Sequence, residues 1–160
     1  MEELQKAYFE TPLGTAKIVG NGSSIVSLVV LDDKIEETKE LPDYLLNAVK
    51  QMNEYFKGSR KVFDFPIVLL GTEFQVKVWY ELCEIPYGKT ISYAEQSKKM
   101  GDPKSIRAVA AANGKNPLWI VVPCHRVIGS NGSLTGYAGG IWRKKWLIEH
   151  EKSEKQQSLF

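Results

Sequence analysis

The stretch that decides the fold of this chain is SYAEQSKKMGDPKSIRAVAAA, residues 92–112. Its first half predicts a short helix, which Gly101 closes. Asp102 then supplies a helix cap and Pro103 a favoured first helical residue, so a second helix is predicted over Lys104–Ala112. Two short helices joined by a tight, glycine-containing turn predict a helix-turn-helix.

The second of these helices is thin, because four of its nine residues are alanine. Arg107 is the long side chain that we expect this helix to expose. Two interpretations are open from this element alone. The helix approaches the floor of a DNA groove, with Arg107 reaching into it, or it is a well-packed helix whose arginine is only solvated.

A cysteine and a histidine stand side by side downstream of the helix pair. The apolar run Leu118–Val122 is typical of a stiff, buried, extended segment, and it leads directly into Pro123-Cys124-His125-Arg126. A thiol beside an imidazole indicates an activated nucleophile. The alternative is a small buried cysteine, since adjacent residues on a strand point to opposite faces.

Two further elements are predicted after the cysteine. Residues Val127–Tyr137 contain the turn signal Asn131-Gly132 and predict a β-hairpin, or wing. A last helix follows, with a set of residues that we expect to pack inward: Trp142, Trp146 and Leu147.

The first 70 residues predict a small scaffold domain. Strand patterns occupy residues 6–31, with a hairpin turn at Asn21-Gly22. A helix is predicted from its cap, Asp43, to Gly58, and Val62–Phe65 predicts a further strand. The fold class is therefore α+β or α/β. We expect a scaffold domain over residues 1–70, a second domain over 71–152 and a flexible tail over 153–160.

Composition limits the location and the partners. No uncharged apolar run approaches the roughly 20 residues of a membrane span, and the acidic, polar start Met1–Lys6 is unlike a signal peptide. Only Cys83 and Cys124 occur, which favours a reducing, cytoplasmic setting. The net charge is −3 over residues 1–70 and +5 over 71–160. Basic charge in the second half gives mild support for an anionic partner, although an ordinary solvated surface explains it equally well.

Five blocks of sequence occur in the order and at the spacing of a known family. They are Ile91-Ser92-Tyr93, Arg107-Ala108-Val109, Asn113–Pro117, Pro123–Gly129 and Gly136–Gly140. Together they resemble the O6-alkylguanine-DNA alkyltransferases, also called methylated-DNA–protein-cysteine methyltransferases. The resemblance is strong over residues 72–151 and holds only in broad pattern before them. It implies a small ribonuclease-H-like domain followed by a winged helix-turn-helix domain that binds DNA and carries the chemistry.

The resemblance makes Cys124 the acceptor, which attacks the alkyl carbon in an in-line displacement. A free thiol, with a pKa of about 8.5, is only a few per cent thiolate at neutral pH, so a base helps. The resemblance gives this role to His125, acting through a water, and makes Glu151 orient and charge-stabilise His125. It also implies that Tyr93 donates a proton to the purine ring and that Asn116 fixes the segment carrying the cysteine.

The pocket for the damaged base is implied to be lined by Tyr93 and Tyr137, with Val127 and Ala138 reading the guanine edge through their backbone groups. Some members of the family have serine where this chain has Ala138, so a hydroxyl hydrogen bond to the base oxygen is absent here. A related non-catalytic group has tryptophan at the acceptor position, and Cys124 argues against membership of that group.

A base inside a duplex hides its alkyl carbon, so the nucleotide must be flipped out, at a cost of about a few kcal/mol. The resemblance implies that Arg107 fills the vacated stack, while the alanine face that includes Ala108 enters the minor groove beside Tyr93. Ser130, in the wing, is implied to contact phosphate.

The implied function is direct repair of O6-alkylguanine, and of O4-alkylthymine, by irreversible transfer to Cys124. A thioether is a poor leaving group, so each molecule acts once. The implied partner is double-stranded DNA containing O6-alkylguanine, with a monomeric protein, no obligate protein partner, no membrane and no cofactor. We expect no zinc, because residues 1–82 lack both His and Cys. We expect a cytoplasmic, nucleoid-associated location, or a nuclear one if the source is eukaryotic.

Two other classes of function share part of this pattern. A helix-turn-helix protein that recognises damage, or regulates transcription, without chemistry would use the basic half and Arg107 but would not need Cys124. A Cys-His hydrolase would use Cys124 and His125 but would leave the DNA-contact blocks unexplained.

Overall fold

The chain forms two units and passes between them three times. The structure, a computed structural model, describes residues 3–134, 137 and 139–157, the last five by their backbone alone. Unit 1 holds the residues up to Leu70 together with Pro117–Trp119, and unit 2 holds Gly71–Asn116 and the residues from Ile120 onward. The chain therefore leaves unit 2 for three residues and returns to it just before the cysteine.

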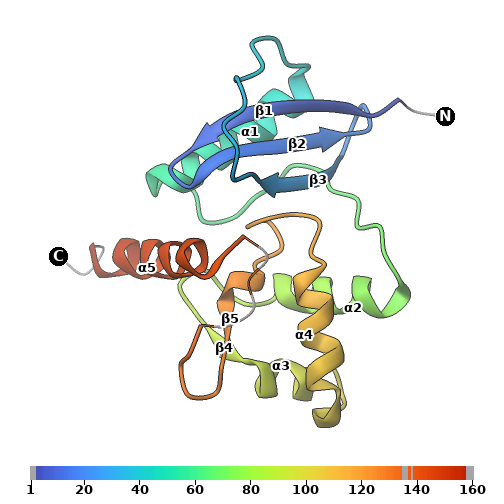
Figure 1. Cartoon of the computed structure of the whole chain (residues 1–160), viewed down its shortest axis with the longest axis vertical. Helices are drawn as coiled ribbons and strands as arrows, with labels where there is room; N and C mark the ends of the chain where they lie inside the picture. Colours follow the sequence, from blue (N-terminus) through green and yellow to red (C-terminus); the bar gives the residue numbers. More distant parts are fainter. Residues whose placement is uncertain (1–2, 135–136, 138, 158–160) are drawn as a thin grey trace. The chain divides into compact units, whose positions relative to one another are not determined.

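Unit 1 is built on an antiparallel sheet with the strand order β1-β2-β3 (Figure 1). The strands are β1 (Gln5–Thr11), β2 (Gly14–Gly20) and β3 (Ile25–Val30). Residues two apart on a strand share a face, and Ala16 and Ile18 of β2 are accordingly both fully buried. The strands predicted within residues 6–31 are confirmed.

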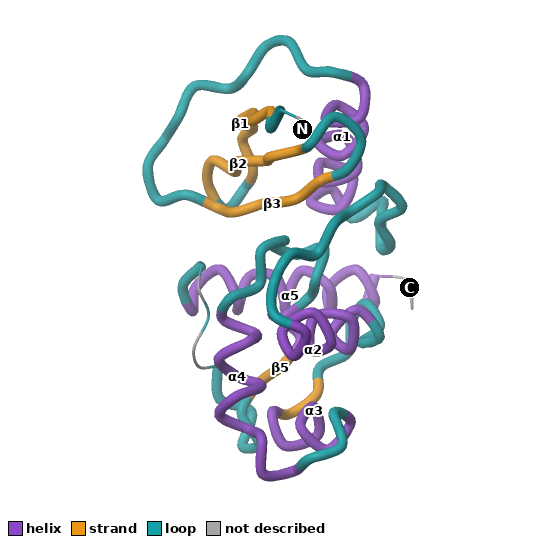
Figure 2. The backbone as a smooth tube through the Cα atoms, turned by 90° about the vertical axis from the view of Figure 1, so that its right-hand side faces the viewer, coloured by secondary structure: helices purple, strands orange, loops and turns teal. Residues whose placement is uncertain are grey.

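Helix α1 (Asp43–Lys57) lies along one face of this sheet (Figure 2). It ends as predicted at Gly58, whose φ of 86° places it in the left-handed region that glycine adopts readily. The predicted cap is wrong, because Pro42 occupies the N-cap position and no side chain caps the helix. Asp43 is instead the first helical residue, where its charge suits the positive end of the helix.

The strand predicted over Val62–Phe65 is absent from the structure. The backbone N–H of Asp64 donates to the side-chain oxygen of Gln51 at 3.0 Å. The side chain of Gln51, in α1, also donates to the Asp64 carboxylate. Because a buried glutamine takes the place of a neighbouring strand, this prediction is wrong.

Three residues from the second half of the sequence, Pro117–Trp119, belong to unit 1 and pair with its strand β3. Leu118 forms a parallel bridge with Leu28 of β3. The N–H of Leu28 donates to the carbonyl of Pro117 at 2.8 Å, and the N–H of Trp119 donates back to the carbonyl of Leu28 at 2.9 Å. Ile120 follows with a φ of 72°, a region that β-branched residues rarely adopt. The predicted extended run is therefore wrong beyond Trp119, where the chain turns sharply.

Unit 2 contains the predicted helix pair (Figure 1). Helix α2 (Glu73–Cys83) comes first, and α3 (Tyr93–Lys99) and α4 (Ile106–Gly114) form the pair. The short 3-10 helix η1 (Pro103–Ser105) occupies the start of the predicted second helix. Aliphatic residues of α2 and α4, Val78, Leu82 and Val109 among them, form the core beneath the pair.

Side-chain caps start α2 and α3. The Thr72 hydroxyl accepts the N–H of Gln75 at 3.1 Å, and the Ser92 hydroxyl accepts the N–H of Glu95 at 3.0 Å. In both helices the third residue bonds back to the cap, which completes a capping box. The Asp102 carboxylate accepts the N–H of Lys104 at 2.9 Å and caps η1, so the predicted cap at Asp102 is confirmed.

Two short strands, β4 (Ile91–Ser92) and β5 (Val127–Ile128), pair in parallel. After β5 the chain turns tightly, and the N–H of Gly129 donates to the carbonyl of Ser133 at 2.8 Å. The predicted hairpin is wrong for the described part of this segment, residues 127–134 and 137, since no second strand follows β5 there.

Helix α5 (Ile141–Gln157) ends the described chain and continues into the segment for which the sequence predicts a tail. Leu147 is buried as expected, whereas Trp142 is 57% exposed, contrary to the prediction. The guanidinium of Arg143 lies 4.5 Å from the centre of the Trp142 ring and covers it instead. Within the described residues, no helix has both the length and the apolar character needed to cross a membrane.

Candidate active site

The cysteine segment is a single 3-10 turn, η2 (Cys124–Arg126), rather than the end of a strand. The N–H of Cys124 donates to the carbonyl of Val122 at 2.8 Å, and the N–H of Arg126 to the carbonyl of Pro123 at 3.0 Å. Cys124 is partly exposed, while His125 is fully buried. The alternation argument for a strand therefore does not apply, and the turn presents the thiol while it places the imidazole in the core.

Asn116 makes two side-chain hydrogen bonds to this segment. Its side-chain amide donates to the carbonyl of Val122 at 2.6 Å and to the sulfur of Cys124 at 3.3 Å. Burial raises the pKa of the Cys124 thiol, and the hydrogen bond from Asn116 acts in the opposite direction. The net rise keeps the sulfur protonated at neutral pH, so nucleophilic attack requires a base.

His125 and Glu151 form a buried pair. Nε2 of His125 lies 2.8 Å from Oε2 of Glu151, and the side chains are 0% and 2% exposed. Because a carboxylate only accepts hydrogen bonds, the hydrogen lies on Nε2 and Nδ1 of the neutral ring is a proton acceptor. Nδ1 is buried and has no hydrogen-bond partner among the described residues. Burial lowers the pKa of His125 despite the opposing effect of Glu151, so the ring is neutral at pH 7.

Arg126 holds the other side of the same carboxylate. Its Nε and Nη2 donate to the two oxygens of Glu151 at 2.8 and 3.0 Å, and its Nη1 donates to the carbonyl of Ile85 at 2.7 Å. This is a bidentate, charge-assisted arrangement. Burial acts to raise the pKa of Glu151, but the bonds from His125 and Arg126 overcome it and hold that pKa far below its usual range.

Tyr93 is the first residue of α3, directly after the Ser92 cap. Its hydroxyl lies 3.5 Å from Nζ of Lys144, which comes from α5 and is 1% exposed. Of the residues predicted to line the base pocket, Val127 is fully buried in β5 and Tyr137 is partly buried. Ala138 lies outside the described residues.

The exposed face of α4 carries the residues predicted to meet DNA. Arg107 and Ala108 are both exposed, and Ser130 is exposed in the turn after β5. The buried face of α4 is fixed by polar contacts as well as by packing. Gln96 of α3 and Asn113 of α4 exchange two side-chain hydrogen bonds of 2.7 Å each. The helix pair is thus held at a fixed angle by a fully satisfied buried amide pair.

Comparison with known proteins identifies the family. Residues 73–153 match the family described as 6-O-methylguanine DNA methyltransferase, DNA binding domain, and residues 4–69 match its ribonuclease-like domain. The chain belongs to the 6-O-methylguanine DNA methyltransferase family. The methylated-DNA–protein-cysteine methyltransferase of Mycobacterium tuberculosis is 45% identical over 154 residues, which cover 94% of this chain and 93% of that protein. The corresponding protein of Methanosarcina acetivorans is 45% identical over 152 residues, covering 92% and 97%.

Solved structures of this methyltransferase family agree with the fold. The crystal structure of the Mycobacterium tuberculosis O6-methylguanine methyltransferase matches with a TM-score of 0.85 and 44% identity, over 95% of this chain and 94% of that one. The structure of Mycobacterium tuberculosis OGT in complex with DNA matches with a TM-score of 0.84 and 45% identity, over 92% of each chain. The family and the fold class predicted from the sequence are confirmed.

Two residues near the cysteine are missing from the set predicted from this methyltransferase sequence. Arg126 is part of the Pro-Cys-His-Arg block, so its position beside the histidine was the available signal. Lys144 offers no such signal, because it is followed by Lys145 and a pair of lysines in a helix usually indicates a solvated face. Only the structure separates them, since Lys144 is buried and Lys145 is exposed.

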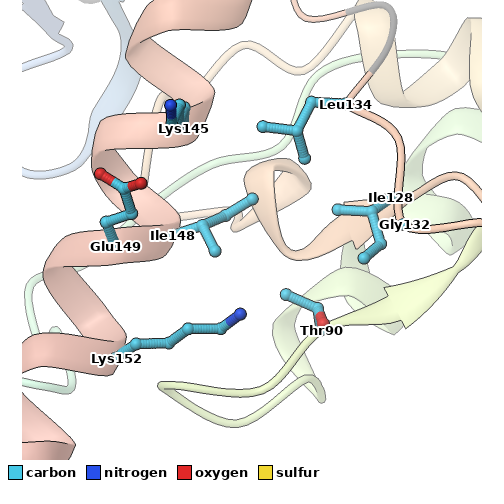
Figure 3. Close-up of a pocket in the computed structure, with 8 residues that line it drawn as sticks. All are labelled: Thr90, Ile128, Gly132, Leu134, Lys145, Ile148, Glu149 and Lys152. Atoms are coloured by element: carbon cyan, nitrogen blue, oxygen red, sulfur yellow. The ribbon is translucent and has the colours of Figure 1, made fainter.

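An open pocket of about 210 Å³ lies on another part of unit 2 (Figure 3). Lys145, Ile148, Glu149 and Lys152 of α5 line one side of it, facing Ile128 and Leu134. Neither Cys124 nor His125 is among its lining residues, so it is separate from the cysteine site. Among the described residues, no three His, Cys, Asp or Glu side chains gather as metal ligands would.

Proposed function

We propose that this protein repairs O6-alkylguanine in duplex DNA by transferring the alkyl group to its own Cys124, once per molecule. One observation carries the proposal: a partly exposed thiol sits next to a buried neutral imidazole, which a carboxylate holds from behind. Membership of the methyltransferase family supports it. So does the similarity to a relative whose structure was solved with DNA.

The first step activates the sulfur. Burial raises the pKa of Cys124, so the thiol proton must leave as the sulfur attacks. We assign its removal to Nδ1 of His125, directly or through a water, as the positive charge that forms on the ring meets the Glu151 carboxylate. Arg126 keeps that carboxylate ionised and aimed at Nε2. Asn116 limits the motion of the sulfur through its bond to Sγ.

The second step is an in-line displacement. The S–C bond forms as the bond between the alkyl carbon and O6 of guanine breaks, and the electron pair passes to the purine. A proton on the purine ring neutralises this charge, and we assign Tyr93 as the donor. The product is a thioether with no built-in means of removal, so the protein is consumed by one repair event.

Access to the base comes from the helix pair. We assign the exposed face of α4 to the minor groove, with Ala108 allowing close approach, Arg107 filling the stack that the flipped base vacates and Ser130 contacting phosphate. This mode needs no sequence-specific contact, which suits damage in any sequence context. Val127, Tyr137 and Ala138 are assigned to the base pocket.

Further aspects of the proposal concern range and setting. O4-alkylthymine is proposed as a second substrate, because it also carries an alkylated exocyclic oxygen. We propose a monomer that needs no protein partner, membrane or cofactor. A DNA substrate places the activity where the genome is: in the cytoplasm at the nucleoid, or in a nucleus if the source is eukaryotic.

Incubation with duplex DNA that carries a radiolabelled methyl group on O6 of guanine tests the proposal. Peptide mapping should place the label on the peptide that contains Cys124, with at most one methyl group per protein. Label elsewhere, or turnover above one, contradicts the mechanism.

Two cysteine variants sharpen this test. Cys124→Ser should abolish transfer and retain DNA binding, whereas Cys83→Ser should keep full transfer, because Cys83 is the exposed cysteine at the end of α2. If Cys124→Ser still removes the alkyl group, the nucleophile assignment is wrong. If the wild-type protein binds alkylated DNA without transfer, a binding module without chemistry is the better interpretation.

A further inference from the structure

The turn that leads into α5 contains two consecutive glycines, Gly139 and Gly140. Gly140 has a φ of 95°, in the left-handed region that glycine adopts readily. Because a glycine pair has little conformational preference of its own, ordering it costs more backbone entropy than ordering other residues. Hydrogen bonds must therefore define this turn, and one closes it directly: the N–H of Gly140 donates to the carbonyl of Tyr137 at 2.9 Å.

A buried arginine provides further hydrogen bonds to the glycine pair. Arg143, in the first turn of α5, is 5% exposed, and its Nη1 donates to the carbonyl of Gly139 at 2.8 Å. Its backbone N–H donates to the carbonyl of Gly140 at 3.2 Å. A guanidinium is planar and donates in fixed directions, so its bond restricts the orientation of the peptide group that accepts it. Arg143 thus holds two successive carbonyls of the turn.

Trp142 restricts the arginine in turn. The guanidinium of Arg143 lies 4.5 Å from the centre of the Trp142 ring, which is 57% exposed. The same ring lies against the turn, since a Cβ added to Gly140 would be 3.3 Å from Cδ1 of Trp142. The indole therefore covers the guanidinium on one side and contacts the glycine pair on another, and this packing limits the motion of both.

This turn belongs to the part of the chain that we assign to the damaged base. Tyr137 and Ala138, which stand directly ahead of the glycine pair, are assigned to the base pocket. Lys144, the residue after Arg143, has its Nζ 3.5 Å from the hydroxyl of Tyr93, so the start of α5 lies at the candidate active site. With alanine at position 138, no side-chain hydroxyl is available there, and base contacts from this turn depend on its backbone.

We propose that Arg143, restricted by Trp142, is a positioning residue for the alkylated base: by holding the Gly139 carbonyl it fixes the backbone that receives the purine. This inference rests on the proposed function and adds to it a residue that acts on the affinity for the base. Arg143 acts through the turn and takes no part in the reaction at the sulfur.

The test uses the full-length protein with Arg143→Met, which removes the donor and keeps an apolar side chain of similar length, in a Cys83→Ser background. The rate of transfer from free O6-methylguanine base should fall about tenfold, the lower end of the effect of one hydrogen bond to a charged group. Alkylation of Cys124 by iodoacetamide needs no base pocket, and its rate should equal that of the parent. A general structural role for Arg143 predicts instead that both rates fall together.

Three variants accompany this test. Lys145→Met removes a cation from an exposed position of the same helix and should match the parent in both rates. Arg143→Lys keeps a charged donor without the planar fork, and should recover part of the lost rate with the free base. Trp142→Leu leaves the guanidinium without its aromatic cover, and should slow the free-base reaction about threefold, the effect of one exposed cation–π contact.

An unchanged free-base rate in folded Arg143→Met overturns the proposal, as does an equal loss of the iodoacetamide rate. If that variant does not fold, Trp142→Leu, a change at an exposed position, decides in its place, and an unchanged free-base rate there overturns the proposal.

A binding measurement separates this inference from the proposed function. Titration of O6-methylguanine base into Cys124→Ser protein, followed by NMR, gives the affinity for the base without any transfer. Adding Arg143→Met should weaken that affinity about tenfold, because the same hydrogen bond is lost. Equal affinities, or no binding by the Cys124→Ser protein itself, overturn the inference. If the affinities differ as expected and the wild-type protein transfers no alkyl group, the proposed function alone is wrong.

Discussion

The two groups of residues that we assign to the repair of a damaged base, the outer face of α4 and the group behind Cys124, are built in opposite ways. The outer face of α4 is exposed and thin, and its candidate residues, Arg107 and Ala108, lie in solvent. The group behind Cys124 is buried: His125, Arg126 and Glu151 are between 0% and 8% exposed, and each is hydrogen-bonded to another member. The outer face of α4 is therefore thin and exposed to solvent, whereas the group behind Cys124 consists of buried, hydrogen-bonded polar side chains.

Because of this difference, substitutions on the two faces should affect different properties of the protein. A side chain on the outer face of α4 meets water in the free protein, so replacing it should change DNA binding and leave stability nearly unaffected. A side chain in the buried group satisfies a charge that has no access to water. Its replacement should therefore cost stability and chemistry together. Substitutions on each face test this contrast.

The largest expected effect is on stability. Arg126→Met leaves the Glu151 carboxylate buried without its bidentate partner, and should lower the free energy of unfolding by about 3–5 kcal/mol in urea denaturation. Arg60→Met is the control, because it breaks an ion pair with Glu54 whose side chains are 27% and 34% exposed. That loss should stay below about 1 kcal/mol. Similar losses in the two variants would remove the contrast.

The second effect is on the chemistry and its pH dependence. Glu151→Gln keeps the shape of the side chain but removes the charge, so transfer to Cys124 should slow about 100-fold in single-turnover assays, the low end of what general-base catalysis contributes. In the parent, burial holds the pKa of His125 below its ordinary value of 6.5, so the rate should be level down to that pH and fall only below it.

Removing Glu151 takes away the interaction that raises the pKa of His125, so the acid limb of the rate should move to still lower pH. A shift of the acid limb to higher pH would show that the carboxylate is not the group that sets the basicity of the ring.

Much of the outer face was predictable from the sequence. The Asp102 cap and the alanine-rich helix depend on residues close together in the chain, so local patterns identify them. The family motifs singled out Cys124 and His125 in the same way, because the two residues are adjacent within one block of sequence. Local patterns are sufficient wherever the partner of a residue lies within a few positions of it.

The buried group was harder to predict, because its partners are far apart in the sequence. Arg126 reaches Glu151 across 25 positions and Ile85 across 41. Lys144 approaches Tyr93 across 51 positions. The extended run predicted ahead of Cys124 failed for the same reason, since β3 of unit 1 takes up Leu118 and the chain then turns at Ile120.

The third effect concerns base flipping. Arg107→Ala should slow transfer from duplex DNA about tenfold, which corresponds to a loss of about 1.4 kcal/mol, and should leave the reaction with free O6-alkylguanine unchanged. Urea denaturation should show no change in stability, because Arg107 is exposed. Equal slowing with both substrates would show that Arg107 acts on the chemistry and not on the flipped state.

The smallest effect is a change in the salt dependence of binding. Lys104 is exposed in η1, between α3 and α4, and its position just ahead of the exposed face of α4 favours a phosphate contact. Each neutralised phosphate contributes about 0.9 to the slope of log affinity against log salt. Lys104→Ala should therefore reduce that slope by about one unit. In the Lys104→Ala background, Arg107→Ala should still slow transfer from duplex DNA. Lys50→Ala, an exposed change on α1 of unit 1, should leave the slope as it is. If both lysines change the slope equally, the DNA contact is not confined to the face that α4 presents, and the contrast between the two faces holds for folding alone.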